Sequence, residues 1–193
     1  MAEAESHTRR RDCPRTLTTR IAPDFLATFE RFQETYRIYA VDPSGQLYQK
    51  DEHYIDEWDD TKKQQVIEIL NYYIDRGGVV VAIQNDKTLL GFAGLDGHLL
   101  GTDDQYLNLG FIHVSLPFRG QGIGMGLFER VCQAAIERSA KKLYIGANPA
   151  VDTYHFYKVM GCIVAEEIVP EVYEAEALDL QLEYVIPSPE TAS

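Results

Sequence analysis

The chain has 193 residues, of which 45% are hydrophobic and 25% charged, a composition typical of one soluble domain with a single core. No segment approaches the roughly 18 consecutive apolar residues of a membrane helix, and the N-terminus lacks the apolar run of a secretory signal, so we expect a cytoplasmic protein without a membrane partner. The net charge of −12 argues against nucleic acid as the partner, because phosphate binding needs clustered Lys and Arg.

The three cysteines are far apart and form neither a CxxC pair nor a disulfide framework. We expect them to be reduced thiols, and we expect no metal site.

A polar tail is expected at each end of the chain. Residues 1–19 carry an arginine cluster and no hydrophobic periodicity, which predicts a disordered tail. The folded domain is expected over residues 20–187, and residues 188–193 would form the second tail.

Two helices are expected in the first part of the domain. Aromatic residues recur at helical spacing over residues 25–36, before a turn at residues 42–45. Residues 51–60 then read as an acidic loop that holds the only tryptophan. A second helix would begin at Asp60-Thr61 and end at Gly77-Gly78.

Beyond Gly78 the spacing of the hydrophobic residues changes to that of β-strands. A strand, a helix and another strand in direct succession predict a parallel crossover, so the fold class is α/β with a mixed sheet. The expected elements are a hairpin of residues 79–83 and 89–95, a strand over 105–114, a helix over 122–140, a strand over 143–146, a short helix over 152–160 and a last strand over 178–186.

A glycine-rich turn separates the strand over 105–114 from the helix that follows it. It reads Arg119-Gly120-Gln121-Gly122-Ile123-Gly124. Its glycines leave room for backbone N–H groups to face an anion such as pyrophosphate at a helix N-terminus. Alone it is a weak signal, because glycines also serve tight turns and helix packing, and the turn lacks both Walker and Rossmann spacing.

Two segments resemble motifs of the GNAT superfamily of N-acetyltransferases. Residues 114–124 are similar to its motif A, whose pyrophosphate loop reads Arg/Gln-x-x-Gly-x-Gly/Ala, and residues 156–161 are similar to its Phe-Tyr-x-x-x-Gly signature. Cys162 stands where an aromatic residue is usual. The resemblance covers about residues 60–186. The fixed positions of the motif A loop are filled by Arg119, Gly122 and Gly124.

The resemblance implies a GNAT fold in which two central parallel strands, residues 105–114 and 143–148, splay apart. Acetyl-CoA, the cosubstrate, would lie in the gap, with its pantetheine along one strand and its pyrophosphate on the glycine turn. The residues implied to bind it are Ile112, His113, Val114, Arg119, Gly120, Gln121, Gly122, Ile123, Gly124 and Asn148.

The resemblance also implies a general acid. Tyr157 matches the superfamily tyrosine that faces the sulfur, where its phenol would protonate the departing thiolate. A core aromatic is the alternative reading.

The identity of the general base stays open. Many relatives carry Glu or His at the position of Asn108, which cannot take a proton, so either an ordered water there or a loop carboxylate would relay it. His113 is expected to be structural, because it alternates with Ile112 and Val114 along the strand. Glu52 and His53 are further candidates near the acceptor site.

We therefore expect an N-acetyltransferase that acts on a primary amine of a small cationic molecule, as a monomer or homodimer. Acetylation of a protein or peptide is one alternative, and a non-catalytic CoA-binding sensor is another. Acidic residues crowd two segments, 51–60 and 166–176, which in GNAT folds commonly flank the acceptor. Solvated surface charge is the alternative reading of these segments.

Overall fold

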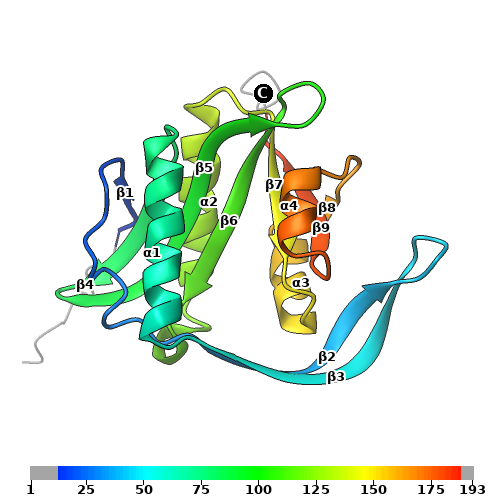
Figure 1. Cartoon of the computed structure of the whole chain (residues 1–193), viewed down its shortest axis with the longest axis horizontal. Coiled ribbons are helices and arrows are strands. Elements are labelled where there is room, and N and C mark those ends of the chain that lie inside the picture. Colours follow the sequence, from blue (N-terminus) through cyan, green and yellow to red (C-terminus); the bar gives the residue numbers. More distant parts are fainter. Residues whose placement is uncertain (1–12, 188–193) are drawn as a thin grey trace, which may run out of the picture.

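The computed structural model describes residues 13–187, which form a large sheet with helices on both faces and a separate two-stranded hairpin (Figure 1). The predicted tail over 188–193 and the first twelve residues of the other tail lie outside the described residues. The strands are β1 (Arg15–Leu17), β2 (Phe32–Val41), β3 (Leu47–Glu57), β4 (Val79–Asn85), β5 (Thr88–Leu100), β6 (Tyr106–Val114), β7 (Lys142–Ala147), β8 (Ile163–Val164) and β9 (Leu180–Val185). The helices are α1 (Asp60–Asp75), the 3-10 helix η1 (Leu116–Phe118), α2 (Ile123–Ile136), α3 (Val151–Val159) and α4 (Pro170–Ala175).

The two central strands of the large sheet separate partway along their length. The order is β1-β4-β5-β6-β7-β9-β8, and β6 and β7 run parallel while the other neighbours run antiparallel. Within the described residues, β6 and β7 pair only between Tyr106–Asn108 and Lys142–Tyr144, and then diverge (Figure 1). The predicted fold class, a mixed sheet with splayed parallel strands, is confirmed.

A β-bulge lies where the strands begin to diverge. On β5, Gly94 pairs with Phe111 and Leu95 pairs with Leu109, so Gly110 is the extra residue of β6. A side chain at Gly110 would collide with the hydroxyl of Tyr73 on α1. Glycine is therefore required for α1 to pack this closely on the bulge.

The helices divide the core into two main clusters, one on each face of the sheet. On the face that Figure 1 turns to the viewer, Leu70 of α1 packs with Phe92 of β5. On the other face, Leu127 of α2 and Tyr157 of α3 pack with Leu109 of β6. The gap between β6 and β7 can therefore be approached from either face.

The segment over residues 25–57 differs most from the prediction. The helix predicted over 25–36 and the acidic loop predicted over 51–60 were wrong: β2 and β3 form an antiparallel hairpin that takes up residues 32–36 of the first segment and residues 51–57 of the second. The turn at 42–45 is confirmed, with Gly45 at a φ of 86°. The aromatic spacing suits a helix, but β-branched and aromatic residues on both sides of a Gly-containing turn favour a hairpin.

This hairpin joins the two halves of the sheet across the wide end of the gap (Figure 1). On the β6 side, the backbone N–H of Leu116 donates to the carbonyl of Glu30. On the β7 side, the N–H of Tyr39 donates to the carbonyl of Pro149, and the Tyr54 hydroxyl donates to Asn148 Oδ1 at 2.8 Å. The hairpin therefore closes one end of the gap.

The remaining differences are smaller. The disordered tail predicted over 1–19 reached too far, because β1 pairs with β4 from Arg15 to Leu17. Helix α1 begins one residue earlier than expected, with Asp59 as the N-cap that accepts from the N–H of Lys62 at 2.7 Å. β8 and α4 are short and were not predicted. Among residues 13–187, no helix is both long and apolar enough to cross a membrane.

Candidate active site

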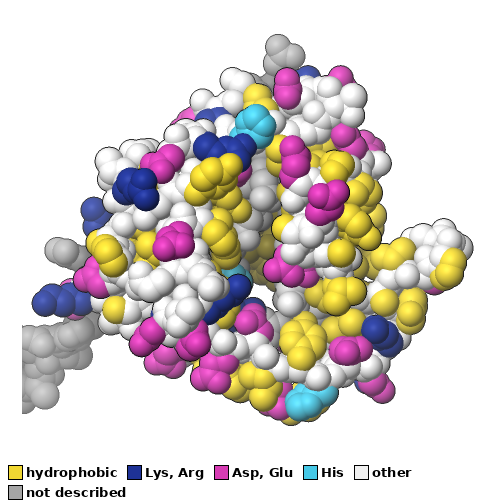
Figure 2. All heavy atoms as spheres, in the orientation of Figure 1, with side chains coloured by type: hydrophobic (Ala, Val, Ile, Leu, Met, Phe, Trp, Pro, Cys, Tyr) yellow, Lys and Arg dark blue, Asp and Glu magenta, His cyan; other side chains and the backbone are white. Residues whose placement is uncertain are grey.

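A cleft of about 1470 Å³ fills the gap between the diverging strands. It is lined by α1, the start and end of the hairpin, β6, the N-terminus of α2, residues at the end of β7, α3 and the segment from α4 to β9. Figure 2 shows it as a hollow between α1 and α4, with acidic side chains on the α4 side. Ligand pockets commonly measure about 300–1,000 Å³. The cleft is therefore large enough for two substrates.

The glycine turn forms the start of α2 at the edge of this cleft. Gly120 and Gly122 have φ angles of 72° and 82°, in the left-handed region that favours glycine. A Cβ at either position would meet nothing within 4 Å. The first N–H groups of α2, which begins at Ile123, have no partner within the helix. This open helix N-terminus fits the predicted binding of a pyrophosphate.

All but one of the predicted cofactor residues line the same cleft. Ile112, His113 and Val114 lie on β6 beyond its last pair with β7, where the backbone on that side is available to an extended ligand. Gln121 does not line the cleft, and its Nε2 lies 3.4 Å from the carbonyl of Pro117.

Arg119 has a bracing role that the sequence did not predict. Its guanidinium donates to the carbonyl of Val114 at 3.2 Å and to that of Phe32 at 2.7 Å. The side chain therefore connects the glycine turn to the first residue of the hairpin.

His113 is enclosed by aromatic rings. Its ring centroid lies 5.0 Å from that of Trp58 and 5.7 Å from that of Phe92. Burial lowers the pKa of His113 well below its usual value, and the positive charges of Arg31 and Arg119 lower it further. A neutral, packed imidazole agrees with the structural role expected for His113.

The two asparagines of the site have different surroundings. Asn148 Oδ1 accepts from the Tyr54 hydroxyl and from the N–H of Ala150 at 3.1 Å, so it holds the hairpin in place. Asn108 belongs to the last residue pair of β6 and β7, and its Oδ1 is buried without a hydrogen-bond partner among the described residues. Because buried acceptors are normally paired, this atom is suited to accept from a ligand or a water in the cleft.

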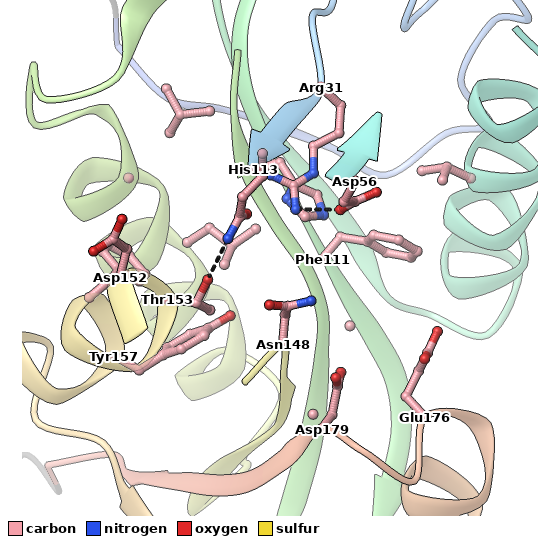
Figure 3. Close-up of a pocket in the computed structure, with 18 of the residues that line it drawn as sticks. Arg31, Asp56, Phe111, His113, Asn148, Asp152, Thr153, Tyr157, Glu176 and Asp179 are labelled. Carbon is pink, nitrogen blue, oxygen red and sulfur yellow. Dashed lines mark hydrogen bonds and ion pairs between the residues drawn. The ribbon is translucent and has the colours of Figure 1, made fainter. Parts of the chain in front are cut away.

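Tyr157 projects from α3 into the gap, beside Asn148 (Figure 3). Its side chain is 5% exposed, while the ring of its neighbour Phe156 lies against Gly124 of the glycine turn. Burial raises the pKa of Tyr157, and the thiol of Cys162 and the carboxyl of Asp179 raise it further. The phenol therefore keeps its proton at neutral pH and can act as a donor.

The carboxylates on the α1 side of the cleft are paired with arginines. Asp56 of the hairpin lies 2.6 Å from Arg31 Nη2, and Asp96 of β5 lies 3.5 Å from Arg76 Nε. Arg31 is itself buried. Neither pair was expected, because residues 25–36 were assigned to a helix and Asp96 lies in a strand made mostly of apolar and glycine residues.

The opposite side of the cleft carries carboxylates without such partners. Glu171 lines it from α4, and Glu176 and Asp179 line it from the segment between α4 and β9. Within residues 13–187 none of the three forms an ion pair with Lys or Arg. We call these three residues the acidic wall. Asp179 follows the acidic run of the sequence and was missed, because no pattern marks its approach to β7.

The other acidic residues named from the sequence lie elsewhere. Glu52 pairs with Lys50, and His53 pairs with Glu34 at 3.1 Å; neither Glu52 nor His53 lines the cleft. Glu166, Glu167 and Glu174 do not line it either. The acidic run over 51–60 contributes one carboxylate to the cleft, that of Asp56.

Asp179→Asn is expected to stabilise the protein at high pH. Burial, together with the nearby negative charge of Glu176, raises the pKa of Asp179 from 3.8 to about 6. The folded state thus binds this proton more tightly than the unfolded chain does. The ionised carboxylate therefore destabilises the fold, by an amount that grows as the pH rises from 3.8 to about 6 and is complete above that range. Removing the charge should raise Tm by about 2–4 °C near pH 8, on the order of 1 kcal/mol after allowance for solvent screening. Near pH 4 the variant and parent should melt together, and an equal difference at both pH values would contradict the assignment.

Comparison with known proteins agrees with this geometry. The acetyltransferase (GNAT) family model matches residues 30–162. Among solved structures, the chain is similar to a nourseothricin acetyltransferase, with a TM-score of 0.64 and 20% identity over 91% of this chain and 99% of that one. It is also similar to a putative streptothricin acetyltransferase from Bacillus anthracis str. Ames in complex with acetyl coenzyme A, with a TM-score of 0.53 and 16% identity over 88% and 92% of the two chains. Ard1 from Thermoplasma volcanium has a TM-score of 0.53 and 15% identity over 91% and 99%.

Identities this low show a shared fold, and no curated protein matches the chain. Within the part of the chain that the structure describes, no group of three His, Cys, Asp or Glu side chains is arranged to hold a metal ion. The family model, in contrast, spans more than half of the chain. The protein therefore belongs to the acetyltransferase (GNAT) family and is an acetyl-CoA-dependent acetyltransferase.

Proposed function

We propose that the protein transfers the acetyl group of acetyl-CoA to a primary amine of a small cationic molecule. The observation that carries this proposal is the acidic wall, whose carboxylates face the cleft without cationic partners among the described residues. Negative charge that lines a cleft attracts cations and raises their local concentration. An acceptor ammonium group would supply the counter-charge.

The two substrates enter from opposite faces of the sheet in this proposal. The glycine turn starts α2, which packs on the face away from the viewer in Figure 1, so acetyl-CoA approaches from that side. The acidic wall adjoins α4 on the near face, across the cleft from α1. The amine therefore meets the thioester in the gap between β6 and β7.

The chemistry needs few groups. Holding an amine and a thioester in contact supplies much of the rate enhancement through proximity. A backbone N–H of β6 beyond Asn108 polarises the thioester carbonyl. Tyr157, which retains its proton, gives it to the sulfur as the C–S bond breaks.

The enclosure of the cleft favours a small acceptor over a folded protein. The hairpin closes one end, while α1 and the α4–β9 segment flank the near face. Two structural neighbours are named as acetyltransferases of nourseothricin and streptothricin, which supports a small-molecule acceptor.

Salt dependence tests the charge of the acceptor. With a linear polyamine, kcat/KM is expected to fall as salt screens the acidic wall over a Debye length of about 8 Å near physiological strength. Replacing Glu171 and Glu176 together by Gln should lower kcat/KM by about tenfold at low salt and flatten this dependence. Steady-state kinetics at several ionic strengths measure both effects.

Glu174→Gln is the matched control, because Glu174 is exposed on the same helix and does not line the cleft. It should behave as the parent does. An unchanged salt response in the double variant would mean that the acidic wall does not bind the acceptor.

A further inference from the structure

Asp179 occupies a distinctive place in the acidic wall. It precedes β9, and its Oδ2 lies 3.9 Å from the point where a Cβ on Gly146 of β7 would stand. Gly146 lines the cleft and has no side chain, so no side chain at this position of β7 stands between the Asp179 carboxylate and the gap. Figure 3 shows Asp179 and Tyr157 on either side of Asn148, both directed into the same space.

We propose that Asp179 is the general base that removes the proton from the acceptor ammonium, opposite Tyr157 as the general acid. The inference rests on the proposed transfer of acetyl to an amine. It supplies a catalytic residue that neither the glycine turn nor the signature around Tyr157 contains.

Five other titratable groups of the cleft are less suited to this role. Asp56 and Asp96 are held by arginines. His113 is packed among aromatic rings. Glu171 and Glu176 are exposed, whereas Asp179, just before β9, is half-buried.

The surroundings of Asp179 tune it for proton transfer. Burial and, to a smaller extent, the negative charge of Glu176 on the same segment raise its pKa to about 6. From α3 it is faced by the neutral Tyr157, and across the cleft stand the Asp96–Arg76 pair and His98. At neutral pH the carboxylate is ionised, yet it is a stronger base than an ordinary aspartate.

The protons and electrons balance with these two residues. Asp179 takes one proton from the ammonium group, and the freed lone pair of nitrogen forms the C–N bond with the carbonyl carbon. The C–S bond breaks with its electron pair on sulfur, which receives the Tyr157 proton. The second amine proton returns to the phenolate through water, and Asp179 releases its proton to solvent.

The pH dependence of kcat/KM for a primary amine tests the proposal. In the parent, kcat/KM should rise through about pH 6 and reach a plateau, because an ionised Asp179 deprotonates the bound ammonium form. In Asp179→Asn, kcat/KM at neutral pH should fall on the order of 10²-fold and rise steadily toward the pKa of the free amine, because only neutral amine reacts.

Three further variants sharpen this test. Glu176→Gln should move the acid limb to lower pH, because it removes a negative charge that raises the pKa of Asp179. Asp179→Glu restores a carboxylate and should recover the plateau in part. Glu174→Gln, outside the cleft, should leave the profile unchanged. Acetyl-CoA affinity, measured by calorimetry without amine, should be the same in all four variants.

A plateau retained in Asp179→Asn, with kcat/KM within about threefold of the parent where a general base typically contributes far more, would overturn the role of Asp179 and leave the acetyl transfer standing. If the parent transfers acetyl to no amine, both the proposed function and this inference are wrong.

Discussion

Replacing Tyr157 by Phe is expected to lower kcat on the order of 10²-fold. The change keeps the buried ring and deletes the hydroxyl that burial holds in its protonated form. Without this donor, the CoA thiolate must leave unprotonated or take its proton from water. Steady-state kinetics with a good amine acceptor measure the loss.

Acetyl-CoA affinity and thermal stability serve as the controls for this variant. Both should change little, because the aromatic contacts of the ring with Phe156 remain. A turnover within about twofold of the parent, where a general acid would typically matter far more, would remove Tyr157 from the catalytic step. It would then be a core aromatic of α3.

Replacing Gly122 by Val is expected to weaken acetyl-CoA binding by about tenfold to a hundredfold. Gly122 has a φ of 82°, and a β-branched residue in this region costs about 1–3 kcal/mol. The turn would relieve the strain by moving its backbone N–H groups away from the pyrophosphate position. The added side chain would also stand in the open space beside the turn. Calorimetric titration with acetyl-CoA measures the change.

Gly45→Val is the matched control for strain. Gly45 has a φ of 86°, and a Cβ at this position would likewise meet nothing within 4 Å, but Gly45 lies in the hairpin turn and does not line the cleft. This variant should lose comparable stability and keep its acetyl-CoA affinity. If both variants bind acetyl-CoA as the parent does, the glycine turn is not the pyrophosphate site.

The sequence predicted the C-terminal two thirds of the fold well, for local reasons. In this part the hydrophobic period changes cleanly between strands and helices, and glycines mark several of the boundaries. The glycine turn and the Phe156-Tyr157 pair are contiguous motifs, so they could be located before their contacts were known. The same motifs predicted which elements meet at the cleft.

The hairpin was missed because its aromatic spacing matches two kinds of structure. Phe25, Phe29 and Phe32 recur at near-helical intervals, yet Phe29 is buried in a turn and Phe32 begins β2. The strand partner of this segment, β3, was hidden by its acidic residues, most of which face solvent.

The least predictable features depend on tertiary contacts. Asp179 enters the site because β9 pairs with β7, and Gly146 leaves room beside it. The bracing contact of Arg119 with Phe32 depends on a hairpin distant in sequence. Periodicity cannot reveal such contacts, because they are fixed by how elements pack.

The most direct test of the account is amine-dependent release of free CoA thiol from acetyl-CoA, followed with a panel of amines and confirmed by the mass of the product. We predict that linear polyamines and other small polycations give rapid thiol release and gain one acetyl group, while neutral and anionic amines react more slowly. Thiol release that does not depend on any amine, or a clear preference for an uncharged or acidic acceptor, would contradict the account.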